Sequence, residues 1–330
     1  MVIVILIMTL LTLIVLSMTQ NANREQRQAL DRQLNGQAFF AAESAISDLK
    51  DYIIQDPGAE LDKTDCDPIS AVNGEYFPNK LSRVSDTDEN IRYSCVLYDQ
   101  RPPTLKYSSV GTSTPLIIPI QDDNREIIDE LTFTWTQKDG GTNFGNCPTG
   151  GNLPGTWPSN CDAGLLRVSL LDPAKTNRKA LSDNTFHGYL KPTPGGAGSA
   201  IYGSGTGTPE SQGTLVNAGC VSGRCTATIK NINKFKLYLK MRSIYKINDV
   251  EINGKTNGGG GVSFINAQAE ADATGRANDV LKRIRVRIDI SGLGGENVPG
   301  FRLQSNQDIC KRLQVIPPNN ISDGCSPPTP

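Results

Sequence analysis

The first 57 residues contain two stretches with different patterns of apolar and polar positions. Residues 1–18 carry no charge, and their only polar side chains are Thr9, Thr12 and Ser17. A helix needs ~20 apolar residues to span a bilayer, so residues 1–19 are predicted to form a membrane segment. No basic region precedes this run and no small-residue cleavage site follows it, as expected if a short basic leader has already been removed.

The second stretch, residues 20–57, has the spacing of an amphipathic helix. Its apolar side chains recur at steps of three and four residues: Leu30, Leu34, Ala38, Ala42, Ala45 or Ile46, Leu49 and Ile53. Pro57 and Gly58 then form a strong stop signal. The pattern predicts one helix from residue 1 to about residue 55, about 80 Å long, with its apolar stripe packed on the rest of the chain. Gly36 marks either a bend or a tolerated helix glycine.

The body, residues 58–330, alternates with a period of two. The clearest runs are residues 131–136, 234–242 and 283–290, and residues 166–170 and 93–98 are shorter ones. This alternation predicts antiparallel sheet with one buried face. The predicted fold class is therefore α+β, with a long N-terminal helix packed on a mainly antiparallel body. A Gly- and Pro-rich segment near 192–213 either divides the body into two lobes or is a loop within one domain.

The composition excludes several kinds of protein. With 33 Lys+Arg against 34 Asp+Glu the net charge is -1, which argues against a globally basic nucleic-acid binder. A single histidine, His187, disfavours histidine metal sites and histidine-dependent acid–base catalysis. Eight cysteines beside one histidine favour disulfides, and hence an oxidising compartment, over zinc.

All eight cysteines lie in the body. Pairing them in order gives four disulfides that staple loops: Cys66–Cys95, Cys147–Cys161, Cys220–Cys225 and Cys310–Cys325. Eight cysteines allow 105 connectivities, so order alone leaves the pairing open. The sequence has no C-x-x-C spacing, so zinc binding is the weaker alternative.

Catalytic and ligand motifs are incomplete. Gly254-Lys255-Thr256 resembles the end of a P-loop, but Asp249 stands where the first glycine belongs. Asp86, Asp88 and Asn90 have calcium-loop spacing, yet Ile91 and Leu97 replace the turn glycine and the bidentate glutamate. Asn320-Ile321-Ser322 is a glycosylation sequon. We therefore expect no enzymatic activity, no cofactor and no metal.

Two predicted strands carry rows of cations. The first contributes Lys234, Lys236, Lys240 and Arg242, and the second contributes Arg283, Arg285 and Arg287. If the two strands were neighbours they would form a basic patch able to capture DNA or an acidic surface. The alternative, which we favour, is a solvated sheet face whose charge is offset by acidic neighbours. DNA is therefore a disfavoured partner.

The helix also carries a family resemblance. The segment Ala41-Ala42-Glu43-Ser44-Ala45, preceded by Gln37 and Phe39-Phe40, is similar to the end of the N-terminal region of PilX-type minor pilins. This segment, the apolar N-terminus and the cysteine-stapled body together resemble a type IV pilin. The resemblance in sequence covers residues 1–55. Position 5, where most major pilins carry glutamate, is Ile5. PilX-type subunits often lack that glutamate.

The resemblance implies a structural subunit of an extracellular filament at the cell surface. The subunit would be inserted in the membrane before assembly and would then pack with itself and other pilins. It implies a leader peptidase, an inner-membrane assembly platform, methylation of the Met1 amine, and roles in adhesion to a host or surface receptor or in motility. The filament core would include Ile5, Thr9, Leu11 and Thr12. The alternatives are a membrane-anchored adhesin that does not polymerise, a tethered enzyme and a DNA-binding minor pilin.

Without a glutamate at position 5, the N-terminal amine needs another acceptor. One hypothesis is that Thr9 or Thr12 of a neighbouring subunit receives it. The alternative, which we favour, is that both threonines bond to carbonyls of their own helix, since hydroxyls compensate a charge poorly.

Overall fold

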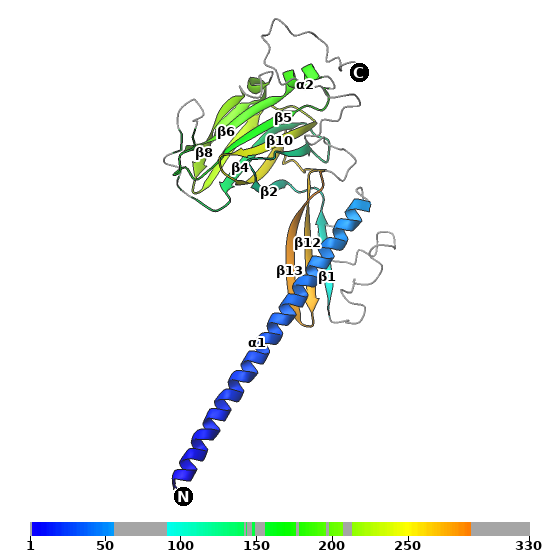
Figure 1. Ribbon diagram of the computed structural model, residues 1–330. Coiled ribbons are helices and arrows are strands. Elements are labelled where there is room, and N and C mark those ends of the chain that lie inside the picture. Colours follow the sequence, from blue (N-terminus) through cyan, green and yellow to red (C-terminus); the bar gives the residue numbers. More distant parts are fainter. Residues whose placement is uncertain are drawn as a thin grey trace, which may run out of the picture. The chain divides into compact units, whose positions relative to one another are not determined.

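The computed structural model describes residues 2–55, 91–141, 143, 147–148, 156–175, 178–195, 198–206 and 213–291. These ranges belong to one compact unit, Met1–Asn297, and the second unit, Val298–Pro330, lies outside the described residues. The described residues form one long helix, a three-stranded sheet and a ten-stranded sheet. Figure 1 shows the long helix beside the strands of the three-stranded sheet.

The long helix, α1, spans Val2–Gln55 without interruption. It confirms the predicted helix and its end just before Pro57. The helix also runs straight through Gly36, and a Cβ atom built on that glycine would meet nothing within 4 Å. Gly36 is therefore a tolerated helix glycine rather than a bend.

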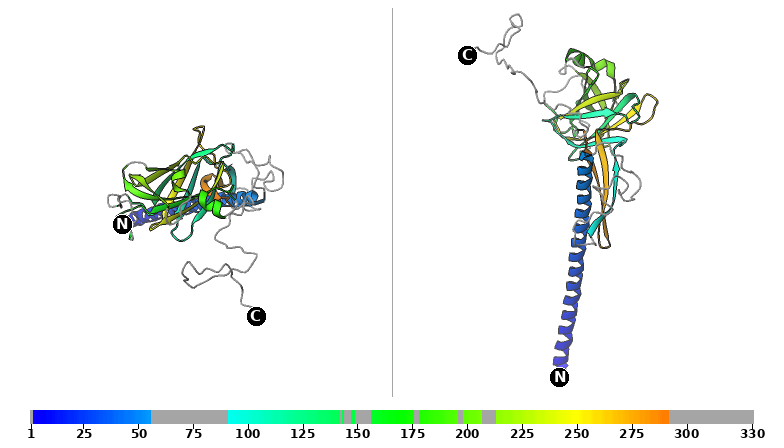
Figure 2. Two further views of the ribbon diagram at one scale, coloured as in Figure 1. Left: turned by 90° about the horizontal axis from the view of Figure 1, so that it is seen from above. Right: turned by 90° about the vertical axis from the view of Figure 1, so that its right-hand side faces the viewer.

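The C-terminal half of α1 packs on an antiparallel sheet of three strands. Their order is β1 (Ile91–Asp99), β12 (Gln268–Ala277), β13 (Val280–Asp289), and α1 contacts all three. The right-hand view of Figure 2 shows the helix running beside these strands. The buried cluster contains five alanines: Ala42 and Ala45 from the helix, and Ala269, Ala271 and Ala273 from β12. Larger side chains fill the rest of it: Leu49, Tyr93, Val96, Tyr98, Ile288 and Ile290.

The predicted apolar stripe is correct from Leu34 to Leu49 and wrong at Leu30. Ala38, Ala42, Ala45 and Leu49 are fully buried, but Leu30 is 55% exposed. A ten-residue strand is about 33 Å long, which corresponds to about 22 residues of helix. The sheet therefore ends before it reaches Leu30. The side chain of Ile53 lies outside the described residues.

The second sheet contains the remaining strands. Their order is β2 (Thr104–Val110), β11 (Asn248–Thr256), β4 (Ile128–Gln137), β9 (Arg224–Lys230), β8 (Thr214–Val221), β6 (Phe186–Pro194), β5 (Leu165–Leu171), β10 (Lys236–Ile244), β3 (Leu116–Gln121). A short strand, β7 (Gly198–Ile201), pairs with β9. The pairs β6–β8 and β7–β9 are parallel, and the other pairs are antiparallel.

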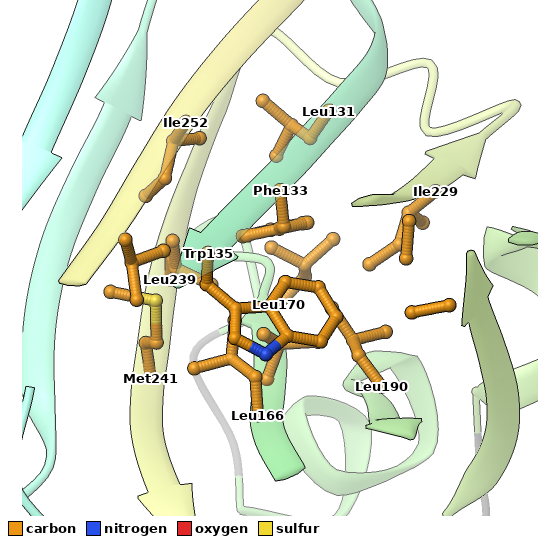
Figure 3. Packing of buried hydrophobic residues seen from close by; sticks show 14 of the residues in the cluster. Leu131, Phe133, Trp135, Leu166, Leu170, Leu190, Ile229, Leu239, Met241 and Ile252 are labelled. Atoms are coloured by element: carbon orange, nitrogen blue, oxygen red, sulfur yellow. The ribbon is translucent and has the colours of Figure 1, made fainter. Parts of the chain in front are cut away.

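This sheet folds over a single apolar core. Side chains from β4, β9 and β11 point toward side chains from β5, β6 and β10, as Figure 3 shows. Trp135 lies in the centre, 1% exposed, and its indole Nε1 donates a hydrogen bond of 3.0 Å to the carbonyl of Gly164. The predicted fold class is confirmed: a long helix on mostly antiparallel sheets. The described residues also form a short helix, α2 (Arg178–Asn184), and a 3₁₀ turn, η2 (Tyr202–Gly205).

Strands β6 and β8 flank most of the segment 192–213. They pair with each other in parallel within the ten-stranded sheet, from Gly188 opposite Thr214 to Pro194 opposite Cys220. This pairing joins the two sides of the segment in one sheet.

Candidate functional site

The N-terminal half of α1 exposes a continuous apolar surface. Its large described side chains between Ile3 and Met18 are 45–72% exposed: Ile3, Ile7, Met8, Leu10, Leu11, Leu13, Ile14, Val15, Leu16 and Met18. Soluble proteins rarely expose contiguous apolar patches of this kind, and larger ones mark sites of protein or membrane interaction. In the described part of the chain, no helix has both the length and the apolarity required to cross a membrane.

The structure places two of the predicted filament-core residues. Leu11 is 55% exposed, and the Thr12 hydroxyl donates a hydrogen bond of 2.9 Å to the carbonyl of Met8 on the same helix. Thr19 makes the same bond to the carbonyl of Val15 at 2.8 Å. The Thr12 hydroxyl thus makes the hydrogen bond within its own helix that sequence reasoning favoured. Met1 and the side chains of Ile5 and Thr9 lie outside the described residues.

The segment that carries the pilin resemblance has two faces. Ala38, Ala41, Ala42 and Ala45 are fully buried, whereas Phe39 and Phe40 are 47% and 62% exposed and meet edge to face, with ring centroids 6.0 Å apart. The alanines bring the helix backbone close to β12. The phenylalanines lie on exposed positions of the same segment, separated from the apolar run that ends at Met18 by a largely polar stretch, residues 19–37.

At Gly275, β12 lies so close to the helix that no side chain would fit. A Cβ atom built there would overlap the carbonyl oxygen of Ala38 and lie 2.5 Å from the amide nitrogen of Ala42. Six residues beyond Ala42 on the helix, a carboxylate oxygen of Asp48 accepts a hydrogen bond of 3.1 Å from the Tyr93 hydroxyl on β1. Sequence reasoning missed Gly275, since a lone glycine in a strand can also mark a bulge.

Two of the four disulfides expected from pairing in order are present. Cys147 bonds to Cys161, and Cys220 bonds to Cys225 across the β8–β9 hairpin. Cys66, Cys310, Cys325 and the side chain of Cys95 lie outside the described residues. The predictions for these four cysteines therefore stay predictions.

The two cationic strands do not adjoin. Strand β10 lies between β3 and β5 in the ten-stranded sheet, whereas β13 pairs with β12 in the three-stranded sheet. On β13, Arg283 binds Asp272, with its shortest contact at 2.6 Å, and Arg285 and Arg287 both bind Glu270. The β13 arginines therefore belong to a face balanced by acidic neighbours, which is the interpretation favoured from the sequence.

Lys234, which precedes β10, pairs with the buried Asp172 at 2.9 Å. Burial by itself would raise the pKa of Asp172. The hydrogen bonds from Lys234 and from the amide of Ala174 outweigh that effect and hold the pKa of this carboxyl below its ordinary value.

The other motif residues do not form a ligand site in the described part of the chain. Gly254, Lys255 and Thr256 form the end of strand β11, so they do not precede a helix as a P-loop does. His187 Nδ1 lies 2.9 Å from the Ser169 hydroxyl. Among the described residues, no three His, Cys, Asp or Glu side chains gather closely enough to hold a metal ion. Asp86, Asp88, Asn90 and the sequon at Asn320 lie outside them.

An apolar N-terminal helix half, continued by an amphipathic half on a β-rich, disulfide-stapled body, defines a subunit with a pilin-like N-terminus. Residues 1–47 match the family model described as PilX N-terminal. This match confirms the resemblance to type IV pilins of the PilX type, over the helix alone, and indicates a type IV pilus component. No curated protein and no solved structure matches the chain.

Proposed function

We propose that this chain is a structural subunit of an extracellular type IV pilus-like filament. The observation that carries the proposal is the apolar surface between Ile3 and Met18, which the body leaves exposed. In the filament, this surface is buried against the same surface of neighbouring subunits. Before assembly, the membrane covers it.

Burial of this surface supplies the driving force for assembly. Fully burying one large apolar side chain contributes about 1.5–3 kcal/mol relative to leaving it exposed. The ten large side chains between Ile3 and Met18 are all exposed by 45% or more, so each has much of this energy still to gain. Conversely, an unpaired charge placed in such a core costs several kcal/mol.

The C-terminal half of α1 holds the body on the filament. The buried alanines attach the helix to the three-stranded sheet. Packing of the helix into the filament therefore also holds the body on the filament. The resemblance to type IV pilins implies that a leader peptidase processes the chain and that an assembly platform in the inner membrane inserts it into the filament. It also implies that the Met1 amine is methylated. Adhesion to a host or surface receptor, or motility, would then belong to the body.

The test is assembly in cells that export the full chain. Leu11→Asp should abolish filaments in electron micrographs of sheared surface material, whereas Gln33→Asp should leave the yield unchanged. Gln33 is exposed on the same helix but lies outside the apolar run. Mass spectrometry of the sheared material should find this chain with a methylated N-terminus.

Two results would refute the proposal. The first is a wild-type filament yield from Leu11→Asp. The second is a wild-type chain that stays in the membrane fraction and never appears in sheared filaments, which would identify a membrane-anchored adhesin instead.

A further inference from the structure

A polar groove crosses strand β2. It consists of two adjoining hollows that share three residues of this strand, Lys106, Tyr107 and Ser108. The larger hollow, about 650 Å³ in volume, is lined by β2, β12 and β13. The smaller one, about 210 Å³, is lined by β2, β4, β11 and the start of β9. We call the two hollows together the β2 groove. The larger hollow has a volume typical of ligand sites.

Charged side chains line the larger hollow. Arg285 and Arg287 of β13 both bind Glu270 of β12, and the distance from Nη2 of Arg287 to Oε2 of Glu270 is 2.7 Å. One carboxylate oxygen of Asp289 accepts a hydrogen bond of 2.9 Å from the amide of Ser291. The side chain of Arg285 is still 69% exposed, so its guanidinium can donate further hydrogen bonds. The larger hollow therefore offers both donors and acceptors to a ligand.

The smaller hollow has the same mixed character. Arg224 lies exposed at the start of β9. Asp249 and Glu251 of β11 supply carboxylates, and Oε2 of Glu251 is 3.9 Å from Nζ of Lys106. Thr134 of β4 adds a hydroxyl. Over the whole β2 groove, four cations stand beside four carboxylates, so the charges of the lining balance.

Tyr107 provides an independent indication of a ligand. Its side chain is buried, 8% exposed, and its hydroxyl has no hydrogen-bond partner among the described residues. Burial raises the pKa of Tyr107, the charge of Asp289 raises it further, and the charge of Arg287 opposes this rise. Both charged groups line the larger hollow, so the Tyr107 hydroxyl lies close to it. A buried hydroxyl without a partner is unfavourable, and a ligand in the hollow can supply the missing acceptor.

Between Thr104 and Lys106, the outer backbone edge of β2 is already occupied. Nε2 of Gln268 on β12 donates a hydrogen bond of 2.7 Å to the carbonyl of Lys106, and Oε1 of Gln268 accepts one of 2.9 Å from the Lys106 amide. Arg287 donates to the carbonyl of Thr104. A peptide that binds as an added strand needs free backbone groups on such an edge. A ligand of the β2 groove is therefore recognised by side chains.

We infer that the β2 groove binds an uncharged polysaccharide. Sugar hydroxyls both donate and accept hydrogen bonds, so they pair with guanidinium groups and with carboxylates alike. Hydrogen bonds to charged groups are also stronger than those between neutral groups. A polyanion would meet as many like charges as opposite ones in this groove, and an apolar ligand would remove water from the charged lining without replacing its hydrogen bonds. The two adjoining hollows suit neighbouring units of one sugar chain.

This inference gives the body a ligand class and does not depend on filament assembly, so the test uses the full chain in detergent. Isothermal titration calorimetry measures the binding of cellohexaose, maltohexaose and N-acetylchitohexaose, which are all neutral. At least one of them should bind with a Kd below about 1 mM. Tyr107→Phe should weaken that binding about tenfold, because it removes one buried hydrogen bond to the ligand. Arg224→Gln and Arg285→Gln, one in each hollow, should each weaken it at least about threefold.

Matched controls make the same chemical changes outside the β2 groove. Tyr98 is the other described tyrosine whose buried hydroxyl lacks a partner, and it lines neither hollow. Tyr98→Phe should therefore leave the affinity within about twofold of wild type. The same result is expected for Arg125→Gln, at an exposed arginine that also lines neither hollow. Both tyrosine variants should melt no lower than wild type, because each loses an unpaired hydroxyl. This measurement separates loss of binding from loss of folding.

The inference is overturned if none of the three hexasaccharides binds the wild-type chain, or if Tyr107→Phe and Tyr98→Phe change the affinity equally. It is also overturned if Tyr107→Phe melts below wild type, because the hydroxyl would then have a partner within the protein. Hexagalacturonate that binds as tightly as the best neutral sugar would identify an acidic polysaccharide as the ligand instead. None of these results changes the expected loss of filaments in Leu11→Asp, so the two proposals fail separately.

Discussion

Replacing Gly275 by alanine should detach α1 from the three-stranded sheet. The added methyl group would overlap the carbonyl oxygen of Ala38 and lie 2.5 Å from the amide nitrogen of Ala42 and 3.0 Å from Cβ of Ala41. Two of these three atoms belong to the helix backbone, so no side-chain rotation relieves the overlap. The helix itself must move away from β12.

The magnitude follows from the packing of this interface. Overpacking a well-packed core typically costs about 1–3 kcal/mol, and a rigid backbone neighbour places Gly275→Ala at the upper end, about 3 kcal/mol. For a folded unit of this size, that corresponds to a melting temperature about 6–12 °C lower. The shift also reduces the burial of Ala42, Ala45 and Leu49, so the amides of this part of α1 should exchange hydrogen faster.

The control is Gly36→Ala, which makes the same chemical change on the helix itself. A Cβ atom at Gly36 meets nothing within 4 Å, so alanine there should stabilise α1 by about 1 kcal/mol. Thermal unfolding and hydrogen exchange of both variants, in the full chain in detergent, give the comparison. If Gly275→Ala melts within 2 °C of wild type and leaves the exchange of residues 38–49 unchanged, the close packing of α1 on β12 is not as described.

Three further outcomes follow from the described contacts. Replacing both Cys220 and Cys225 by serine should lower the free energy of unfolding by about 2 kcal/mol, because the disulfide closes a loop with a sequence separation of only 5; an unchanged urea midpoint would contradict this. The lowered pKa of Asp172 means that its pair with Lys234 stabilises the fold above pH 3.8, its ordinary value, and that this contribution is lost as the pH falls further. Asp172→Asn should therefore lower stability at pH 7 and flatten the loss of stability in acid, and equal acid profiles would refute the assignment. Thr12→Val should leave filament yield unchanged, since the Thr12 hydroxyl bonds within its own helix, and reduced yield would point to a contact between subunits.

The parts of the fold that depend on local pattern could be predicted from the sequence. The helix follows from the apolar run of residues 1–18, from the spacing of three and four between Leu30 and Ile53, and from the stop at Pro57, so Val2–Gln55 differs little from the predicted range. The runs in β4, β10 and β13 alternate so regularly that their strands and buried faces followed directly. In β5 the strand was predictable, but its Ser169 is buried although alternation places it on the outward face. Cys220–Cys225 was predictable because its partners are near neighbours in the sequence.

The pairing of distant strands could not be predicted. Strand β1 pairs with β12, about 170 residues away, and alternation determines which face of a strand is buried but not which strand lies beside it. For this reason β10 and β13 could be imagined as neighbours, although they lie in different sheets.

Alanines and phenylalanines lie on different sides of α1. On the sheet side, small side chains let the helix backbone approach β12 so closely that only glycine fits at position 275. Larger residues at Ala38, Ala41 or Ala42 would push the helix outward. On the opposite side no such restriction applies, and Phe39 and Phe40 remain exposed at 47% and 62%. Exposing two aromatic rings is unfavourable for an isolated subunit, because each large apolar side chain left in water forgoes about 1.5–3 kcal/mol. The matched segment, residues 1–47, therefore contains both a surface fitted to the chain's own sheet and an apolar surface that the described body does not cover.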